Sequence, residues 1–416
     1  MLKLKDLFSR GKQSAEAGNG PGGLSKAKDS LPGGTRLPAE QRSRVKLPGK
    51  LGSLLSSLPS IKGIFAAKKE LVGLDIGSSS LKLAELLETK TGYVLNHFSE
   101  ISLGKGTIED GVLIDPDALT EKIKALFRGT GLQRKAIVTS LSGHATIVKK
   151  VTLPTMEEAG LRDLIHDEAS KYLPFDNMDD VNYDFQILGQ NEFNPNQMEV
   201  VLVAAKKDVI ESFTEAIENA GVTVMIMDVD TFSMETVYEA NYDFDPADIV
   251  VMVNIGASIT NINVMKGSLS IFTRDFTLAG NSITEAIQAI HSLTFDAAEA
   301  MKINGPDADE MTREAFRGSL LSYADPICTE IERSIDYFRS TSGGDSIKKI
   351  LLSGGVAAIP GITADLTQRL GIETEILNPI RNIEYNKKVL NADRIDEIRS
   401  IAAVAVGLAL RKVGDK

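Results

Sequence analysis

The chain has 416 residues, of which 43% are hydrophobic and 25% charged, and its formal net charge is −11. This length is enough for two lobes with a substantial core, and a single cysteine, Cys328, excludes an intrachain disulfide framework and favours a reducing compartment. We expect a cytoplasmic protein, because no secretory signal is visible and the longest apolar run, Ile401–Leu410, is about half the ~20 residues of a membrane helix.

Residues 1–69 differ in charge from the rest of the chain. They hold 14 basic and 4 acidic residues, whereas the remainder holds 32 basic and 53 acidic residues. Residues 1–60 are rich in Gly, Pro and Ser, which cannot bury enough apolar area to fold, and a disordered basic arm is predicted there. Two roles remain open for it, contact with an anionic membrane surface or a solvated tail. The acidic remainder argues against a nucleic-acid partner.

A first lobe is predicted to begin at residue 61 and to contain a strand, a Gly/Ser turn and a second strand between Leu71 and Leu83. The turn glycine lets backbone N–H groups approach an anion, and the flanking hydroxyls and a lysine add donors and charge. The candidate phosphate-binding residues are Gly77, Ser78, Ser79, Ser80 and Lys82, and Asp75 is the candidate for holding Mg²⁺ through water. One such turn is weak evidence, because most are ordinary hairpins.

The first lobe continues to residue 141, and an inserted unit follows. A strand near 92–102, a helix over Pro116–Arg128 and a strand over Lys135–Leu141 are predicted from the apolar spacing. Residues 142–224 read as a small mixed α/β insert with two helices, Glu157–Tyr172 and Asp208–Ala220, and one strand, Val200–Ala204. The run 146–151 is β-branched but alternates too irregularly to predict a strand. Residues 225–247 then return to the first lobe with a helix.

An apolar cluster ends the first helix of the insert, since a helix usually stops before proline. It consists of Tyr172, Leu173, Pro174 and Phe175. Two interpretations remain open for these side chains, a surface that binds a partner and ordinary packing of the insert's own core.

The second lobe, predicted over 248–400, repeats the hairpin of the first. The run Val250–Ile262 places Asn254 at the position of Asp75, 179 residues further along, and Gly256 and Ser258 at the positions of Gly77 and Ser79. Thr260 adds a hydroxyl. Two related lobes with facing hairpins would hold a polyphosphate from both sides, and the repeat makes the phosphate interpretation much stronger.

A third signal lies near the C-terminus, where a buried strand, 349–353, enters a Gly354-Gly355 turn before a helix. These glycines leave room for a flat nucleoside against the backbone, and a following helix N-terminus favours an anion. Residues 401–416 are predicted as a C-terminal helix that closes the cleft, with small residues that allow a close approach between helices. The alternative for that helix is plain burial.

Together these motifs resemble the actin-like ATPase superfamily, which implies an α/β fold of two RNase H-like lobes around a nucleotide cleft. The element Ala298–Lys302 looks like the one with which bacterial members contact the nucleoside, which implies roles for Glu299 and Lys302. The implied ligands are ATP and Mg²⁺. The insert lies where FtsA-like proteins carry their extra subdomain.

Three strings narrow the resemblance to the PilM family of type IV pilus assembly proteins. They are 72–79 at the entry strand, 168–175 in the insert and 272–276 after the second hairpin. The resemblance implies an ATP-binding scaffold that docks the cytoplasmic tail of the membrane protein PilN in a groove between the insert and the first lobe. It also implies contact with pilus assembly ATPases and the inner-membrane platform, and a location at the inner face of that membrane.

Hydrolysis is expected to be slow or absent. Superfamily members normally carry Asp where this chain has Asn254, and an amide brings no negative charge to a metal ion. Asp230 is the candidate for orienting the attacking water, at a place where relatives carry a carboxylate or amide, but a helix N-cap is an equally good role for it. The four histidines show no metal-ligand spacing. The alternative functions are an FtsA-like division scaffold and a small-molecule kinase, for which no substrate-side base is evident.

Overall fold

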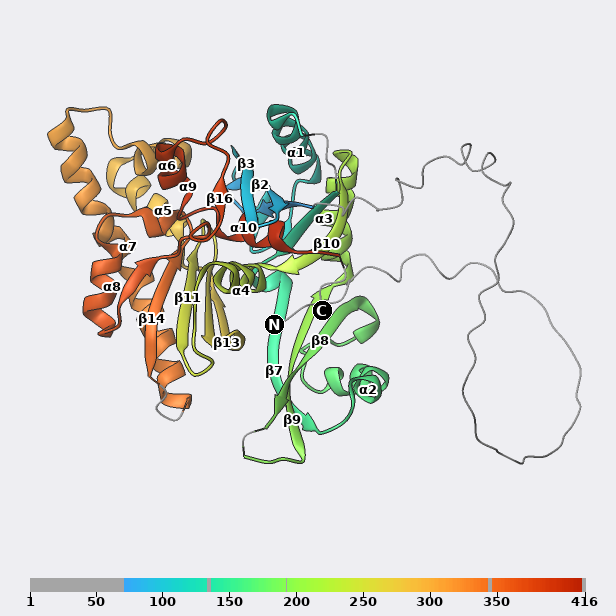
Figure 1. Ribbon diagram of the computed structural model, residues 1–416. Coiled ribbons are helices and arrows are strands. Elements are labelled where there is room, and N and C mark those ends of the chain that lie inside the picture. Colours follow the sequence, from blue (N-terminus) through green and yellow to red (C-terminus); the bar gives the residue numbers. More distant parts are fainter. Residues whose placement is uncertain (1–70, 133–135, 192, 343–345, 414–416) are drawn as a thin grey trace, which may run out of the picture. The chain divides into compact units, whose positions relative to one another are not determined.

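The computed structural model describes residues 71–132, 136–191, 193–342 and 346–413. Within these ranges the chain forms two large β-sheets and a three-stranded sheet (Figure 1). A two-stranded ribbon pairs β4 (Ile108–Glu109) with β5 (Val112–Leu113). The basic arm predicted over 1–60 lies outside the described residues, as do the last three residues of the predicted C-terminal segment.

The first large sheet has the strand order β10-β6-β1-β2-β3-β16. Strands β1, β2 and β3 are antiparallel neighbours, while β6 and β10 run parallel to β1. Helices α1 (Pro116–Thr130) and α3 (Lys207–Asn219) share one apolar cluster with β1. The strands are β1 (Val72–Ile76), β2 (Ser80–Thr89), β3 (Gly92–Ser102), β6 (Ala136–Leu141), β10 (Thr223–Val229) and β16 (Glu384–Tyr385).

The second large sheet repeats this arrangement in the order β13-β12-β11-β14-β15. Its first three strands are antiparallel, and the last two run parallel to β11. The strands are β11 (Ile249–Ile255), β12 (Thr260–Lys266), β13 (Leu269–Phe276), β14 (Ile347–Ser353) and β15 (Thr374–Ile376), and helices α5 (Gly280–His291), α6 (Phe295–Asn304), α7 (Glu310–Thr341) and α8 (Ile362–Leu370) pack in its cluster. The prediction of two related lobes is confirmed.

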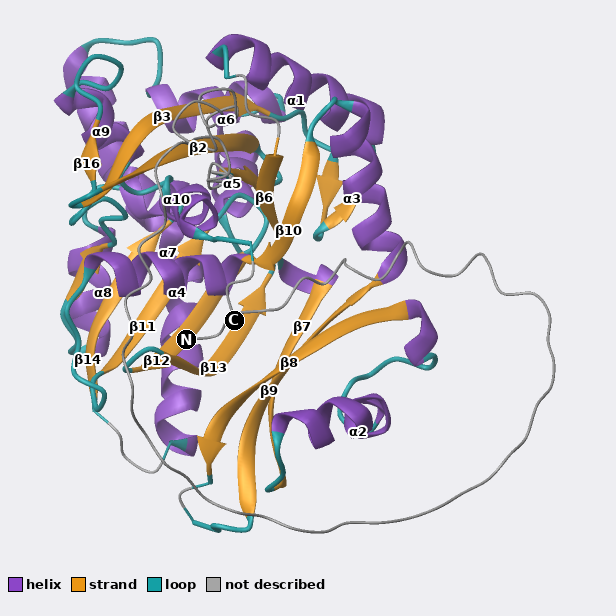
Figure 2. Cartoon of the chain, turned by 45° about the vertical axis from the view of Figure 1, so that its right-hand side comes forward, coloured by secondary structure: helices purple, strands orange, loops and turns teal. Residues whose placement is uncertain are grey.

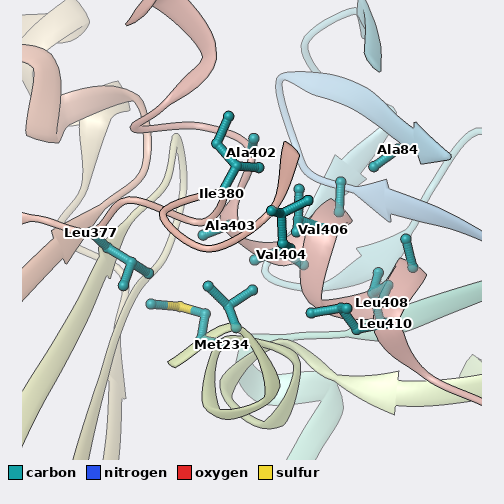
Figure 3. Close-up of a cluster of buried hydrophobic side chains, with 14 of the residues drawn as sticks. Ala84, Met234, Leu377, Ile380, Ala402, Ala403, Val404, Val406, Leu408 and Leu410 are labelled. Atoms are coloured by element: carbon teal, nitrogen blue, oxygen red, sulfur yellow. The ribbon is translucent and has the colours of Figure 1, made fainter. Parts of the chain in front are cut away.

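Two helices, α4 (Asp230–Asn241) and α10 (Ala403–Leu410), pack in one apolar cluster with residues of both sheets. Figure 3 shows Met234 of α4 and Val404, Val406 and Leu408 of α10 in this cluster. A Cβ at Gly407 would lie 2.0 Å from the Ser233 carbonyl oxygen, so the two helix backbones are in contact. The close approach predicted from small residues is therefore present.

Residues 146–206 form the insert, with the sheet order β7-β9-β8 and helix α2 (Glu158–Ser170) (Figure 2). The structure differs from the prediction in two strands, because β7 (Thr146–Pro154) pairs along its whole length with β9 (Gln197–Lys206), and β8 (Val181–Gln190) was not foreseen. The insert is also shorter than 142–224. Helix α3 packs with α1, and β10 pairs with β6, so both belong to the first lobe.

The segment after β15 returns to the first lobe, although the second lobe was predicted to extend to residue 400. Strand β16 pairs with β3, and helix α9 (Ala392–Ile398) contributes Ile395 and Ile398 to the central cluster. Strand β16 therefore belongs to the first lobe, whereas Ser400 lies against the second, because its carbonyl oxygen accepts hydrogen bonds from Ser353 and Gly354.

Candidate nucleotide site

The first hairpin turn is closed by a hydrogen bond from the Gly77 amide to the Ser80 carbonyl oxygen, 3.1 Å long. Asp75 and Lys82 are cross-strand partners, and the Lys82 Nζ lies 3.3 Å from the Asp75 carboxylate with both side chains largely buried. Ser80 donates its hydroxyl to Glu100 on β3, at 2.8 Å. The lysine is thus held at the turn by an acidic neighbour.

The second hairpin has the same geometry. The Gly256 amide donates to the Ile259 carbonyl oxygen at 3.0 Å, as Gly77 does to Ser80. Asn254 is the cross-strand partner of Asn261, so an uncharged amide pair occupies the positions of Asp75 and Lys82. The predicted register between the two hairpins is confirmed.

The two turns meet. The Ser258 hydroxyl donates to the Ser78 hydroxyl at 2.8 Å, and the Asn281 side chain donates to Ser258 at 3.1 Å. Both turns line one cavity of about 520 Å³ at the carboxyl ends of the parallel strands of both sheets. The predicted residues that line it are Asp75, Gly77, Ser78, Ser79, Ser80, Lys82, Asp230, Asn254, Gly256, Ser258, Glu299, Lys302, Gly354 and Gly355.

Thr260 does not line this cavity, which corrects its assignment as a ligand-binding residue. Its side chain is fully buried and donates to the Leu278 carbonyl oxygen at 2.9 Å. Side chains alternate between the two faces of a strand. The neighbouring Asn261 therefore faces the cavity instead.

The Gly354-Gly355 turn forms another part of the cavity wall. Gly354 has φ +92°, and a Cβ there would lie 2.2 Å from the Ile255 carbonyl oxygen, so the position requires glycine. A Cβ at Gly355 would meet no atom within 4 Å. The backbone at Gly355 therefore adjoins open space, as a binding surface for a flat group would.

Lys302 and Glu299 form an internal network beside this turn. The Lys302 ammonium donates to the Gly280 carbonyl oxygen at 3.1 Å and to the Thr284 hydroxyl at 2.8 Å, and it lies 2.6 Å from the Glu299 carboxylate. Thr284 also donates to Glu299. These contacts hold the side chains of Lys302 and Glu299 in place.

Asp230 is the first residue of α4, but its side chain does not cap that helix. It accepts a hydrogen bond from the Ser140 hydroxyl at 2.5 Å. Burial, and secondarily the charge of Asp75, raises the pKa of Asp230 to about 8. Sequence reasoning missed Ser140 and Glu100, although the parallel strand ending at Leu141 and the strand opposite Lys82 were both predicted.

Asp230→Asn is expected to flatten the dependence of stability on pH. The pKa of Asp230 is raised from 3.8 to about 8, so its contribution to stability is complete below about pH 4 and is lost as the pH rises through 8. The melting temperatures should diverge by roughly 2 to 5 °C per pH unit. Melting curves from pH 5 to 9 test this, with the exposed Asp163→Asn as control. A difference that stays constant with pH would contradict it.

The apolar cluster of the insert is split between its core and its surface. Leu173 is buried in the insert's core, Tyr172 and Phe175 are half-buried against that core, and Pro174 is exposed. Leu173 therefore packs the insert. The other three side chains remain accessible to a partner.

Two kinds of feature are absent from the described residues. No cluster of three or more His, Cys, Asp or Glu side chains is arranged there to hold a metal ion. In the same part of the chain, every helix is too short or too polar to cross a bilayer.

The chain is similar to known proteins of type IV pilus assembly. Residues 73–413 match the family of type IV pilus assembly protein PilM. A chain in a solved PilM–PilN type IV pilus biogenesis complex is 28% identical, with a TM-score of 0.73 over 83% of this chain and 98% of that chain.

More distant relatives belong to cell division. The protein FtsA of Enterococcus hirae is 22% identical over 387 residues, or 80% of this chain and 86% of that protein. FtsA of Enterococcus faecalis is 22% identical over 354 residues, or 72% of this chain and 76% of that protein. The two-lobed structure with paired hairpins is the actin-like ATPase fold, and the chain belongs to the PilM family of type IV pilus assembly proteins.

Proposed function

We propose that this actin-like scaffold of pilus assembly binds ATP in the cavity and docks the cytoplasmic tail of a PilN-like membrane protein on its insert. The observation that carries the nucleotide part is the contact between the two hairpin turns, Ser258 to Ser78, at one cavity that also contains the Gly354-Gly355 turn. Docking to such a tail would hold the chain at the inner face of the membrane.

The cavity suits a nucleoside triphosphate in shape and charge. Gly77 and Gly256 remove side chains from the turns, so backbone amides can approach phosphate oxygens. Lys82 supplies a positive charge beside them. The open face at Gly355 leaves room for the nucleoside.

The residues present fit a water-held magnesium ion on one side of the cavity only. Asp75 carries a carboxylate at the first hairpin, whereas Asn254 at the second carries none. Magnesium usually retains several waters and binds through one or two carboxylates together with phosphates. When bound, it would neutralise part of the phosphate charge. We infer a weak magnesium requirement that depends on Asp75.

ATP hydrolysis should be slow, because the side chains that would activate water or hold a metal ion carry little or no negative charge. The raised pKa of Asp230, about 8, keeps its carboxyl group largely protonated near pH 7, and only the ionised minority can accept a proton from water. Asn254 adds no charge for a metal ion. Calorimetric titration with ATP and a phosphate-release assay test this proposal together. Absence of ATP binding would refute the nucleotide part, and a turnover above about 1 s⁻¹, ordinary for enzymes, would refute the scaffold part.

Tyr172→Ala is expected to weaken binding of a PilN-like tail peptide by about tenfold, because truncating a half-buried aromatic at an interface commonly costs more than 1 kcal/mol. Titration of a labelled peptide measures this. Tyr337→Ala is a matched control, since Tyr337 is an exposed tyrosine of the second lobe. Leu173→Ala should instead lower the melting temperature, because Leu173 is core. Unchanged peptide affinity in Tyr172→Ala would contradict this surface.

A further inference from the structure

The cavity contains an exposed apolar side chain beside its nucleoside-contacting element. Ile303 follows Lys302 near the end of α6, lines the cavity, and leaves 70% of its surface exposed. An isoleucine exposed at the wall of a cavity is favourably covered by a flat apolar group. The neighbouring open face at Gly355 gives such a group space.

Arg317, on α7, also lines this cavity. The only cations among the described lining residues are Lys82, Lys302 and Arg317. Lys82 lies at the hairpins, and Lys302 is held by Gly280, Thr284 and Glu299. Arg317 is different, because it is half exposed and its guanidinium lies 3.4 Å from the carboxylate of the exposed Glu310. Exposed pairs of this kind contribute little, so the guanidinium can turn to a ligand at small cost.

A planar guanidinium stacks on aromatic faces and is attracted by their π electrons. On the basis of the proposed nucleotide function, we propose that Arg317 stacks on the base of the bound nucleotide while Ile303 covers apolar surface of the same base. Arg317 is then a specificity-determining residue that favours purine over pyrimidine triphosphates, because a two-ring base offers the larger stacking face.

The test compares ligands with and without a base. Arg317→Ala should weaken ATP binding about fivefold to thirtyfold, as expected for a cation–π contact. Its affinity for inorganic tripolyphosphate should not change, and its preference for ATP over CTP should fall. Arg317→Lys keeps the charge but loses the planar group, so it should recover little. Calorimetric titration measures all of these affinities.

Arg333→Ala is the matched control, since Arg333 lies on the same helix, is 71% exposed and does not line the cavity. It should bind every ligand as the wild type does. Two results would overturn the inference: unchanged ATP affinity in Arg317→Ala, or an equal loss for tripolyphosphate, which would make Arg317 a phosphate ligand. Failure of the wild type to bind ATP would refute the proposed function itself, and the inference with it.

Discussion

Lys82→Ala should lower ATP affinity by about 10- to 100-fold. The Lys82 ammonium is largely buried beside the first turn, 3.3 Å from Asp75, and a hydrogen bond to a charged group contributes about 1.5 to 3 kcal/mol. Its loss also leaves the Asp75 carboxylate without its partner beside the turn that would hold the phosphates, so like charges would repel the ligand. Titration calorimetry with ATP and with tripolyphosphate should show the same fractional loss for both ligands.

Two variants separate this effect from a general loss of structure. Lys124→Ala removes a half-exposed lysine of α1 that forms an ion pair with its helix neighbour Glu121 and does not line the cavity, so it should leave binding unchanged. The double variant Asp75→Asn with Lys82→Ala removes the orphaned carboxylate, so its melting temperature should recover while its ATP affinity stays low. Wild-type affinity in Lys82→Ala would show that the triphosphate does not bind at the hairpins.

The hairpins could be predicted from the sequence because their signals are local. A glycine turn between two apolar runs defines register within about a dozen residues, and the second copy confirms the first. Thr260 was wrongly assigned to the site, although the register between the two hairpins already indicates that Asn261 faces the cavity. Its equivalent in the first hairpin is Leu81, which is also buried, whereas Lys82 corresponds to Asn261.

The residues missed at the site depend on contacts between distant segments. Ser140 and Asp230 are 90 residues apart and meet because β6 and β10 are parallel neighbours. Glu100 on β3 accepts its hydrogen bond from Ser80 on the neighbouring strand β2. Strand β7 was missed for a different reason, because its first five residues are half-buried or exposed, so apolar alternation is absent there. Pairing with β9, rather than sequence pattern, makes it a strand.

Gly407→Ala is expected to lower the stability of the whole described fold by about 3 kcal/mol or more. The added methyl group would lie 2.0 Å from the Ser233 carbonyl oxygen, and this neighbour is helix backbone that cannot turn away. Helices α4 and α10 would have to separate, which opens the apolar cluster that both large sheets share. Thermal unfolding should show a fall of several degrees in melting temperature.

Gly318→Ala provides the matched control for this change. Gly318 lies inside α7, and a Cβ there would meet no atom within 4 Å. Alanine is a better helix former than glycine by about 1 kcal/mol, so this variant should be as stable as the wild type or slightly more stable. Because both variants add the same methyl group to a helical glycine, the difference between their melting temperatures isolates the contact between α4 and α10. Equal melting temperatures would show that the two helices are not packed backbone to backbone.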